Sequence, residues 1–143
     1  MEGSARLRVI ADSGAVYALM DRSDAWHERV LRWWERAPDE VLLPVTTLPE
    51  ITWLLARRIG AHAEAAFVRA VADRHYTVEW LEDSDLVRTA ELVEAYADLE
   101  LGFVDASLVA MAERLDVGVV LTTDRRHFGV VRPRHADRLR LVP

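Results

Sequence analysis

Four carboxylates could act together in chemistry although they lie far apart in the sequence: Asp12, Glu50, Asp105 and Asp124. Asp12 and Asp124 each come just after a short apolar segment that predicts a buried strand. Glu50 and Asp105 lie in the first turns of predicted helices. Ligands of open parallel sheets bind beyond the carboxyl ends of the strands, so we expect all four side chains at that edge. Carboxylates gathered there repel one another unless a cation intervenes, and their oxygens suit Mg²⁺ or Mn²⁺.

Each of these acids also has a structural explanation that needs no ligand. Asp12 could cap the helix that follows it, and Asp124 could close an Asx turn. Thr47 and Glu50 form a T-x-x-E capping box, and Asp105 occupies a first-turn position that the helix dipole favours. Taken singly, these structural roles are favoured. Together the four acids favour a divalent-metal site, because all 18 basic residues are arginine and no lysine can neutralise the cluster.

Composition narrows the class of protein further. The 143 residues, 51% apolar and 29% charged, are typical of one globular domain spanning residues 1–143. No run of about 18 apolar residues predicts a membrane span and no signal peptide is recognisable, so we expect a cytoplasmic protein that does not bind membranes. The absence of cysteine excludes disulfides, thiolate zinc sites and cysteine nucleophiles. The absence of lysine excludes P-loops and Schiff-base chemistry.

The net charge of −6 argues against a protein that coats nucleic acid by general electrostatics. The charge is unevenly distributed along the chain, however. Residues 125–143 contain six of the 18 arginines and a single acid, Asp137. A basic C-terminal segment therefore follows an acidic body.

Alternating strand and helix signals predict the fold. Five short apolar segments indicate strands at residues 7–11, 41–45, 76–81, 119–122 and 139–142. Helices are expected after Ser13 and over residues 26–37, 47–59, 61–75, 83–99 and 104–116. Pro38 ends the second of these helices, Gly60 ends the third, and Asp83 or Ser84 caps the fifth. This alternation predicts an α/β fold with a mostly parallel central sheet of about five strands and helices on both faces.

The segments around the four acids resemble the PIN domain, and more closely the VapC-type toxins of bacterial toxin–antitoxin pairs. The segments are IADSGAVYALMDRSDAWH, PVTTLPEITWLL, LGFVDASLVAMAERL and VLTTDRRHFGVV. The resemblance covers nearly the whole chain in order. Its most specific part is a D-x-S/A-L-x-A-x-A helix followed by a strand and T-x-D-x-x-x-F. The acids that form the metal site in this family fall on Asp12, Glu50, Asp105 and Asp124, and none is missing.

The resemblance implies a Mg²⁺- or Mn²⁺-dependent endoribonuclease that hydrolyses RNA with metal-activated water. In that family pattern Asp12 is the central metal ligand and Asp105 and Asp124 complete the metal shell. Glu50 binds the metal or orients the water. The resemblance also implies three partners: an RNA substrate, a VapB-type antitoxin and a second copy of the chain in a homodimer.

Two other functions fit parts of the sequence. A PIN-fold binding module could dock a partner or RNA with little or no cleavage, and the acidic net charge speaks weakly for it. A phosphatase of the haloacid dehalogenase kind is disfavoured, because Asp12 is followed by Ser13 and Gly14 without a second aspartate two positions on. That class also needs a lysine, which this chain lacks.

Residues beside the acids are candidates for binding the substrate. Ser13 could touch phosphate or metal-bound water, or it could simply cap a helix. Thr122 could bond the scissile phosphate or the Asp12 carboxylate. Arg125 and Arg126 could grip RNA phosphate on either side of the cut, or they could be a solvated pair or dock an acidic partner.

Other polar and aromatic residues have no settled role in the sequence. Asp24 and His27 match a D-x-x-H stretch seen in such toxins, but a helix cap and a partly buried histidine are favoured. His127 and His135 are too isolated for us to expect them as ligands. Three tryptophans form a cluster: Trp26, Trp33 and Trp34. This tryptophan cluster exceeds what one short helix needs, so it either packs in the core or forms an apolar patch for a partner.

Overall fold

The computed structural model describes residues 7–36 and 40–143, which contain one parallel sheet of five strands. The strands are β1 (Arg8–Ala11), β2 (Glu40–Pro44), β3 (Thr77–Glu79), β4 (Val119–Leu121) and β5 (Arg140–Val142). Their order in the sheet is β3-β2-β1-β4-β5, and each neighbouring pair is parallel. The predicted α/β fold is confirmed, with a strand at each predicted segment.

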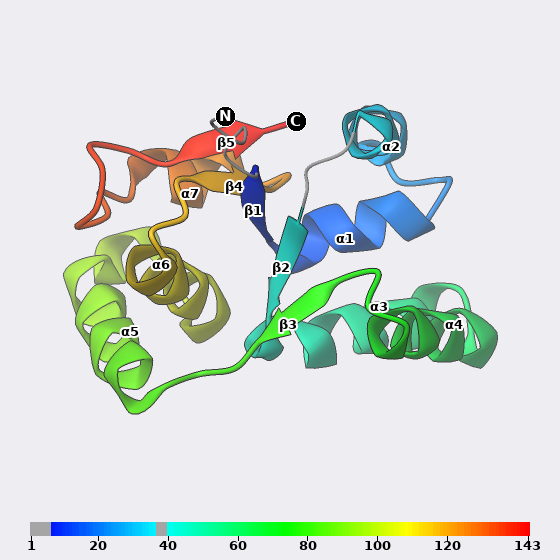
Figure 1. Cartoon of the computed structure of the whole chain (residues 1–143), viewed down its shortest axis with the longest axis horizontal. Coiled ribbons are helices and arrows are strands. Elements are labelled where there is room, and N and C mark those ends of the chain that lie inside the picture. Colours follow the sequence, from blue (N-terminus) through cyan, green and yellow to red (C-terminus); the bar gives the residue numbers. More distant parts are fainter. Residues whose placement is uncertain (1–6, 37–39) are drawn as a thin grey trace, which may run out of the picture.

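Helices cover both faces of this sheet (Figure 1). The α-helices are α1 (Ser13–Met20), α2 (His27–Glu35), α3 (Leu48–Arg58), α4 (Ala61–Ala72), α5 (Asp83–Ala95), α6 (Phe103–Leu115) and α7 (Arg125–Val130). Two short 3₁₀ helices are η1 (Val45–Thr47) and η2 (Ala97–Leu99). Helices α1 to α4 lie on one face and α5, α6 and α7 on the other. Within the described residues, no helix has both the length and the apolar character needed to cross a membrane.

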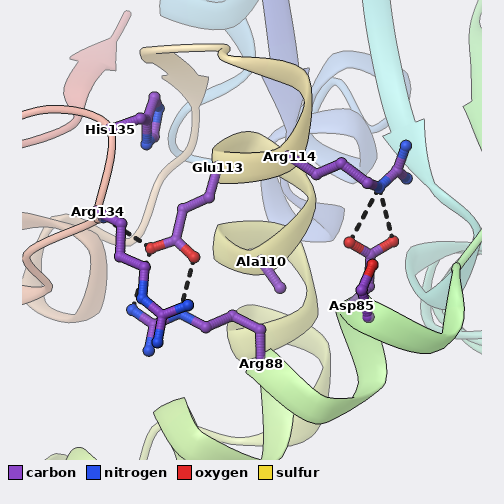
Figure 2. A pocket seen from close by; sticks show the side chains of 8 residues that line it. Asp85, Arg88, Ala110, Glu113, Arg114, Arg134 and His135 are labelled. Atoms are coloured by element: carbon purple, nitrogen blue, oxygen red, sulfur yellow. Dashed lines mark hydrogen bonds and ion pairs between the residues drawn. The ribbon is translucent and has the colours of Figure 1, made fainter.

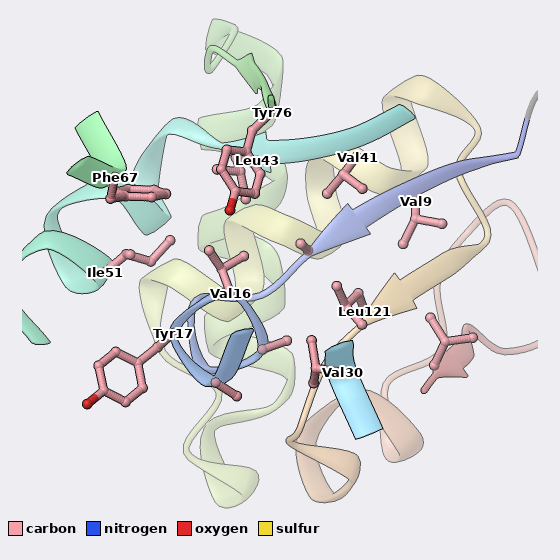
Figure 3. Close-up of a cluster of buried hydrophobic side chains, with 14 of the residues drawn as sticks. Val9, Val16, Tyr17, Val30, Val41, Leu43, Ile51, Phe67, Tyr76 and Leu121 are labelled. Atoms are coloured by element: carbon pink, nitrogen blue, oxygen red, sulfur yellow. The ribbon is translucent and has the colours of Figure 1, made fainter. Parts of the chain in front are cut away.

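Side chains on the two faces of the central strand β1 pack into two separate hydrophobic cores. Val9 and Ala11 pack with the helices α1 to α4, whereas Ile10 points into the core formed with α6. Figure 3 shows the first core, in which Val9, Val41 and Leu121 from three strands point toward the helices. Successive side chains of a strand face opposite sides, so a strand buried on both faces must be apolar throughout. This explains the uninterrupted apolar runs in the sequence.

The tryptophan cluster packs against the first core, and each of its members is only partly buried. The Trp34 ring lies 5.5 Å from the Tyr76 ring and 6.4 Å from the Trp33 ring, measured between centroids. The core interpretation of the cluster therefore holds. The most exposed tryptophans are elsewhere, at Trp53 on α3 and at Trp80 after β3.

The start of α5 differs from the expected cap. Its N-cap is Glu82, whose side chain accepts a hydrogen bond from the amide of Asp85. Asp85 returns the bond by accepting from the Glu82 amide at 2.9 Å. This capping box places Asp83 and Ser84 inside the first turn, so neither is the cap.

Other helix ends differ in smaller ways. Gly60 follows α3 with a φ of 146° and donates its amide to Leu55 O at 2.9 Å, as expected for a residue that ends a helix. Helix α7 is not predicted, because a six-residue helix carries too little periodicity to be recognised. The residues expected to end α2, Ala37 and Pro38, lie outside the described residues.

Ion pairs fasten α5 to α6 on the second face of the sheet (Figure 2). Arg88 donates to both oxygens of Glu113, at 2.8 Å and 3.0 Å. Arg114 Nε lies 3.0 Å from both oxygens of the buried Asp85 carboxylate. Burial tends to raise the pKa of Glu113, but hydrogen bonds from Arg88 and the Arg134 amide lower it overall. Arg88 and Arg114 are therefore neutralised by carboxylates of the same chain.

Arg88→Gln should lower the free energy of unfolding by about 2 kcal/mol, because it leaves the largely buried Glu113 carboxylate without its bidentate partner. Urea unfolding followed by tryptophan fluorescence at neutral pH measures this. Arg69→Gln on α4 is the control, since Arg69 is exposed and forms no ion pair with the described residues. Equal stability of the two variants would contradict a structural role for this pair.

Candidate functional site

The carboxyl ends of β1 and β4 form the floor of the candidate site. β1 pairs with β4 through Ala11 and Leu121, so the residues that follow them, Asp12 and Thr122, lie side by side. The Asp12 amide donates to Leu121 O at 2.9 Å, which continues the ladder one residue past the strand. Both polar side chains therefore emerge at the predicted edge of the sheet.

Asp12 is buried at this edge, and both of its carboxylate oxygens accept short hydrogen bonds. It is the N-cap of α1, because Oδ1 accepts from the Gly14 amide at 2.8 Å. Oδ2 accepts from the Thr122 hydroxyl. Burial raises the pKa of Asp12, and the charges of Asp124 and Glu50 add to this, although the two hydrogen bonds act in the opposite direction. The expected cap and the expected acid cluster are both present.

Glu50 faces α1 and does not take part in the expected capping box. Its Oε1 accepts from the Ser13 hydroxyl at 2.9 Å. The prediction of a box with Thr47 is wrong, because Thr47 is already helical (φ −79°, ψ −22°) at the end of η1 and its hydroxyl donates to Pro44 O at 2.7 Å. A residue in this conformation cannot present its side chain as an N-cap does. The Glu50 carboxylate is thereby left for the site.

Asp105 lies in the first turn of α6, at the same edge. A 2.7 Å hydrogen bond between the Ser107 and Thr46 hydroxyls joins this part of α6 to η1, which leads into α3. Burial raises the pKa of Asp105 to about 6, with further contributions from the negative charges of Asp12 and Asp124. A carboxyl group whose pKa responds to other acids in this way belongs to one electrostatic cluster with them.

His127 is the residue that joins Asp105 to Asp124. Its Nδ1 lies 3.1 Å from Asp105 Oδ2 and 2.9 Å from Asp124 Oδ2. Carboxylates accept and do not donate, so Nδ1 carries the hydrogen of its bond to Asp105, and Asp124 Oδ2 lies close beside it. Asp124 also caps α7, because its Oδ1 accepts from the His127 amide at 3.0 Å. The expectation that His127 is isolated is wrong, and its spacing of three residues from Asp124 was the signal that a helical turn would bring them together.

The residues present fit a divalent cation. Ligand atoms of Asp105, Asp124 and His127 all lie within 4.8 Å of one another. Asp12 and Glu50 add two more carboxylates, whose charges raise the pKa values of the cluster. Clustered oxygen ligands that repel one another are what a small, hard cation such as Mg²⁺ or Mn²⁺ stabilises.

The neighbouring hydroxyls orient the acids. Ser13 donates to Glu50 and lies 3.4 Å from Asp12 Oδ1, so it bridges these two carboxylates. The Thr122 hydroxyl donates to the Asp12 carboxylate, which is one of the two partners that the sequence suggested for it. The same hydroxyl oxygen accepts a hydrogen bond from the Asp124 amide at 2.8 Å. The hydroxyl of Thr122 thus links the ends of β1 and β4 through side chains.

The remaining candidates lie around this cluster. Arg125 and Arg126 are exposed, and Arg125 Nη2 donates to Pro143 O at 2.5 Å. His27 Nδ1 lies 2.7 Å from Ala18 O, and Asp24 accepts from the Trp26 amide at 2.8 Å. His27 is partly buried, as the sequence favoured. The expected helix cap at Asp24 is wrong, because the N-cap of α2 is Trp26 and Asp24 bonds the backbone of the turn that precedes the helix.

Comparison with known proteins places the chain among relatives of one kind. The family model described as the PIN domain matches residues 9–132. Ribonuclease VapC26 from Mycobacterium tuberculosis (strain ATCC 25618 / H37Rv) is 29% identical over 135 residues, which cover 94% of this chain and 100% of that protein.

Solved structures share the fold at lower identity. VapC20 from M. tuberculosis, a sarcin–ricin loop cleaving toxin, has a TM-score of 0.77 and 24% identity over 82% of this chain and 90% of that chain. The DNA-bound VapBC complex from Salmonella typhimurium contains a chain with a TM-score of 0.69 and 16% identity, covering 94% of this chain and 96% of that one. These likenesses establish the fold.

Asp105→Asn should stabilise the metal-free protein at pH 7 by about 2 kcal/mol. The pKa of Asp105 in the folded protein, about 6, lies above the ordinary value of 3.8, so the folded state binds this proton more tightly than the unfolded chain. Stability is therefore lost as the pH rises through this range, and the gain from asparagine should vanish below about pH 4.

Urea unfolding in EDTA at several pH values measures this effect. Asp98→Asn at the exposed start of the turn after α5 is the control and should change little at any pH. A variant at Asp105 that is less stable than the wild type at pH 7 would contradict a raised pKa of this buried carboxyl group.

Proposed function

The chain belongs to the PIN domain family, and from this membership and the acid cluster we propose that it is a metal-dependent endoribonuclease, the toxin of a toxin–antitoxin pair. The observation that carries the proposal is the convergence of Asp12, Glu50, Asp105 and Asp124 at one edge of the sheet. These are the positions at which the resemblance places the family's metal site. The ribonuclease activity named for the relative VapC26 supports the same reaction class.

Asp12, Asp105 and Asp124 would hold Mg²⁺ or Mn²⁺, with Asp12 as the central ligand. When bound, such a cation would lower the pKa of a water molecule that it coordinates and would offset negative charge on a phosphodiester. The buried Asp12 carboxylate is oriented for this task, since its two oxygens are already held by the Gly14 amide and the Thr122 hydroxyl. The requirement for a cation also follows from the repulsion among the acids.

The protein's own groups would then position the reactants. Glu50, held by Ser13, orients the attacking water and accepts its proton. His127 keeps the carboxylates of Asp105 and Asp124 close together, since its Nδ1 bonds Asp105 and lies 2.9 Å from Asp124. Arg125, next to Asp124 at the mouth of the site, contacts an RNA phosphate. We assign the exposed Arg126 the same role for a second phosphate.

The proposed toxin has three partners. RNA is the substrate, a VapB-type antitoxin blocks the site, and a second copy of the chain forms a homodimer in the cytoplasm. The solved relatives support the first two of these assignments, since they include a sarcin–ricin loop cleaving toxin and several toxin–antitoxin complexes.

Asp12→Asn should reduce Mn²⁺-dependent cleavage of RNA at least about 100-fold, because it removes the charge of the central ligand without changing its shape. The measurement is the initial rate of cleavage of total RNA from an antitoxin-free preparation. Asp98→Asn is the matched control and should cleave like the wild type. A wild-type protein that binds RNA in Mn²⁺ but leaves it intact would contradict the proposal and favour a PIN-fold binding module.

Mn²⁺ should also raise the melting temperature of the wild-type protein. A cation that binds only the folded state stabilises it by about 2.7 kcal/mol at a concentration 100 times its Kd. The increase should be much smaller in Asp12→Asn and Asp105→Asn, and unchanged in Asp98→Asn. Equal shifts in all four proteins would place the cation outside the acid cluster.

A further inference from the structure

A second charged site lies beside the acid cluster and has the opposite sign. A cavity of about 650 Å³ is lined by four arginines, a tryptophan and the last residue of the chain: Arg29, Arg32, Trp33, Arg36, Arg125 and Pro143. We propose that this arginine pocket binds the phosphate backbone of an RNA strand next to the point of cleavage. The inference rests on the proposed function, because it names the surface that holds the substrate of the acid cluster.

The arginine pocket is assembled from three separate elements. Arg29, Arg32 and Arg36 follow one another at intervals of three and four residues and so lie on one face along α2. Arg125 is the first residue of α7 and directly follows Asp124 of the acid cluster. Figure 1 shows the chain end beyond β5 lying toward α2, which brings Pro143 between these helices. The pocket and the acid cluster therefore share the start of α7.

The arginines of the pocket keep their charge available. All four are exposed, and within residues 7–36 and 40–143 none forms an ion pair with an Asp or Glu side chain. Arg125 Nη2 donates to Pro143 O at 2.5 Å, whereas the three arginines of α2 face no anion in the described part of the chain. Figure 2 shows the contrasting case, in which Arg88 and Arg114 are matched with Glu113 and Asp85. Neighbouring cations with no internal anion repel one another and attract an external one. In a chain of net charge −6, this concentration of positive charge indicates a polyanion as the ligand.

Aromatic rings in and beside the pocket favour RNA over an acidic peptide. Arg29 lies over the Trp26 ring at 4.7 Å from its centroid, and Arg125 lies over the same ring at 5.9 Å. Such stacking orients a guanidinium without consuming its charge. Trp33 lines the cavity and also packs against the first core, so it offers a ring held in place by its neighbours for a base to stack on. The carboxylates of an acidic peptide would use the cations but would not stack on this ring, as a base does.

The pocket also resolves how an acidic protein can hold RNA. Phosphate contacts supply affinity through release of counterions, and they need positive charge only along the path of the strand. Arg125 would contact the phosphate nearest the acid cluster, and the three arginines of α2 would contact successive phosphates beyond it. Contacts to phosphates on one side of the scissile bond do not depend on the RNA sequence. The choice of cleavage site would therefore be made by other surfaces of the protein.

The test compares RNA binding by the wild type and by a triple variant, Arg29→Gln, Arg32→Gln and Arg36→Gln. The probe is a fluorescein-labelled single-stranded oligouridylate of about 12 nucleotides, measured by anisotropy in EDTA over a range of NaCl concentrations. Each lost phosphate contact removes about 0.7 from the slope of log K against log salt, or about fivefold in affinity at 0.1 M salt. The triple variant should therefore bind about 100-fold more weakly, with a slope smaller by about 2.

Arg57→Gln is the matched control. Arg57 is an exposed arginine over a tryptophan, 5.2 Å from the Trp53 centroid on α3, but it lies outside the pocket. Its loss should leave both affinity and salt slope unchanged. Glutamine retains good helix propensity, and matching melting temperatures of all three proteins verify that the fold is intact.

The outcomes separate this inference from the proposed function. If the wild type fails to cleave RNA in Mn²⁺ but the triple variant loses RNA binding, the ribonuclease proposal is wrong and the pocket assignment stands. If the wild type cleaves RNA and the triple variant binds the probe with wild-type affinity and slope, the pocket assignment is overturned. The same holds if the triple variant loses binding only of a polyglutamate peptide, which would reassign the pocket to an acidic protein partner.

Discussion

The burial of one carboxylate, Asp12, at the end of the central strand is the constraint on which the site depends. A buried charge is costly unless hydrogen bonds or an opposite charge compensate it. The Gly14 amide and the Thr122 hydroxyl supply the hydrogen bonds, and both come from backbone segments that leave the sheet beside Asp12. The negative charges of Glu50 and Asp124 further destabilise the ionised form of Asp12 and raise its pKa. A bound cation would offset this repulsion.

Charged residues that stabilise the fold and charged residues that we assign to function lie in different parts of the molecule. The two cores and the ion pairs between α5 and α6 hold the sheet, and the arginines there are matched with carboxylates such as Glu113 and Asp85. At the carboxyl edge of the sheet, the acid cluster and the arginine pocket lie on either side of the start of α7. The arginines of the pocket do not form ion pairs with the acids of the cluster. One end of the molecule thus presents negative charge for a metal next to positive charge for a phosphate chain.

Much of this architecture was predictable because its signals are local. Strands buried on both faces must be apolar, so β1 and β4 are visible as short apolar runs that end at polar residues. Other features depend on neighbours that are remote in the sequence. The capping box expected at Thr47 is absent because η1 makes that residue helical, and α7 is too short to show a period. His127 looked isolated because its partner Asp105 is 22 residues away.

The sequence by itself determined the chemistry that is possible: four acids at strand ends and helix starts, no cysteine, and arginine as the sole cation apart from histidine. It also determined that the sheet is parallel, which directs those acids to one edge. Only the tertiary structure decided which groups touch. His127 lies between Asp105 and Asp124, and α2 lies opposite Arg125, because helix packing against the sheet sets these directions and local propensity does not. The convergence of the acids on His127 and the arginine pocket beside them are products of that packing.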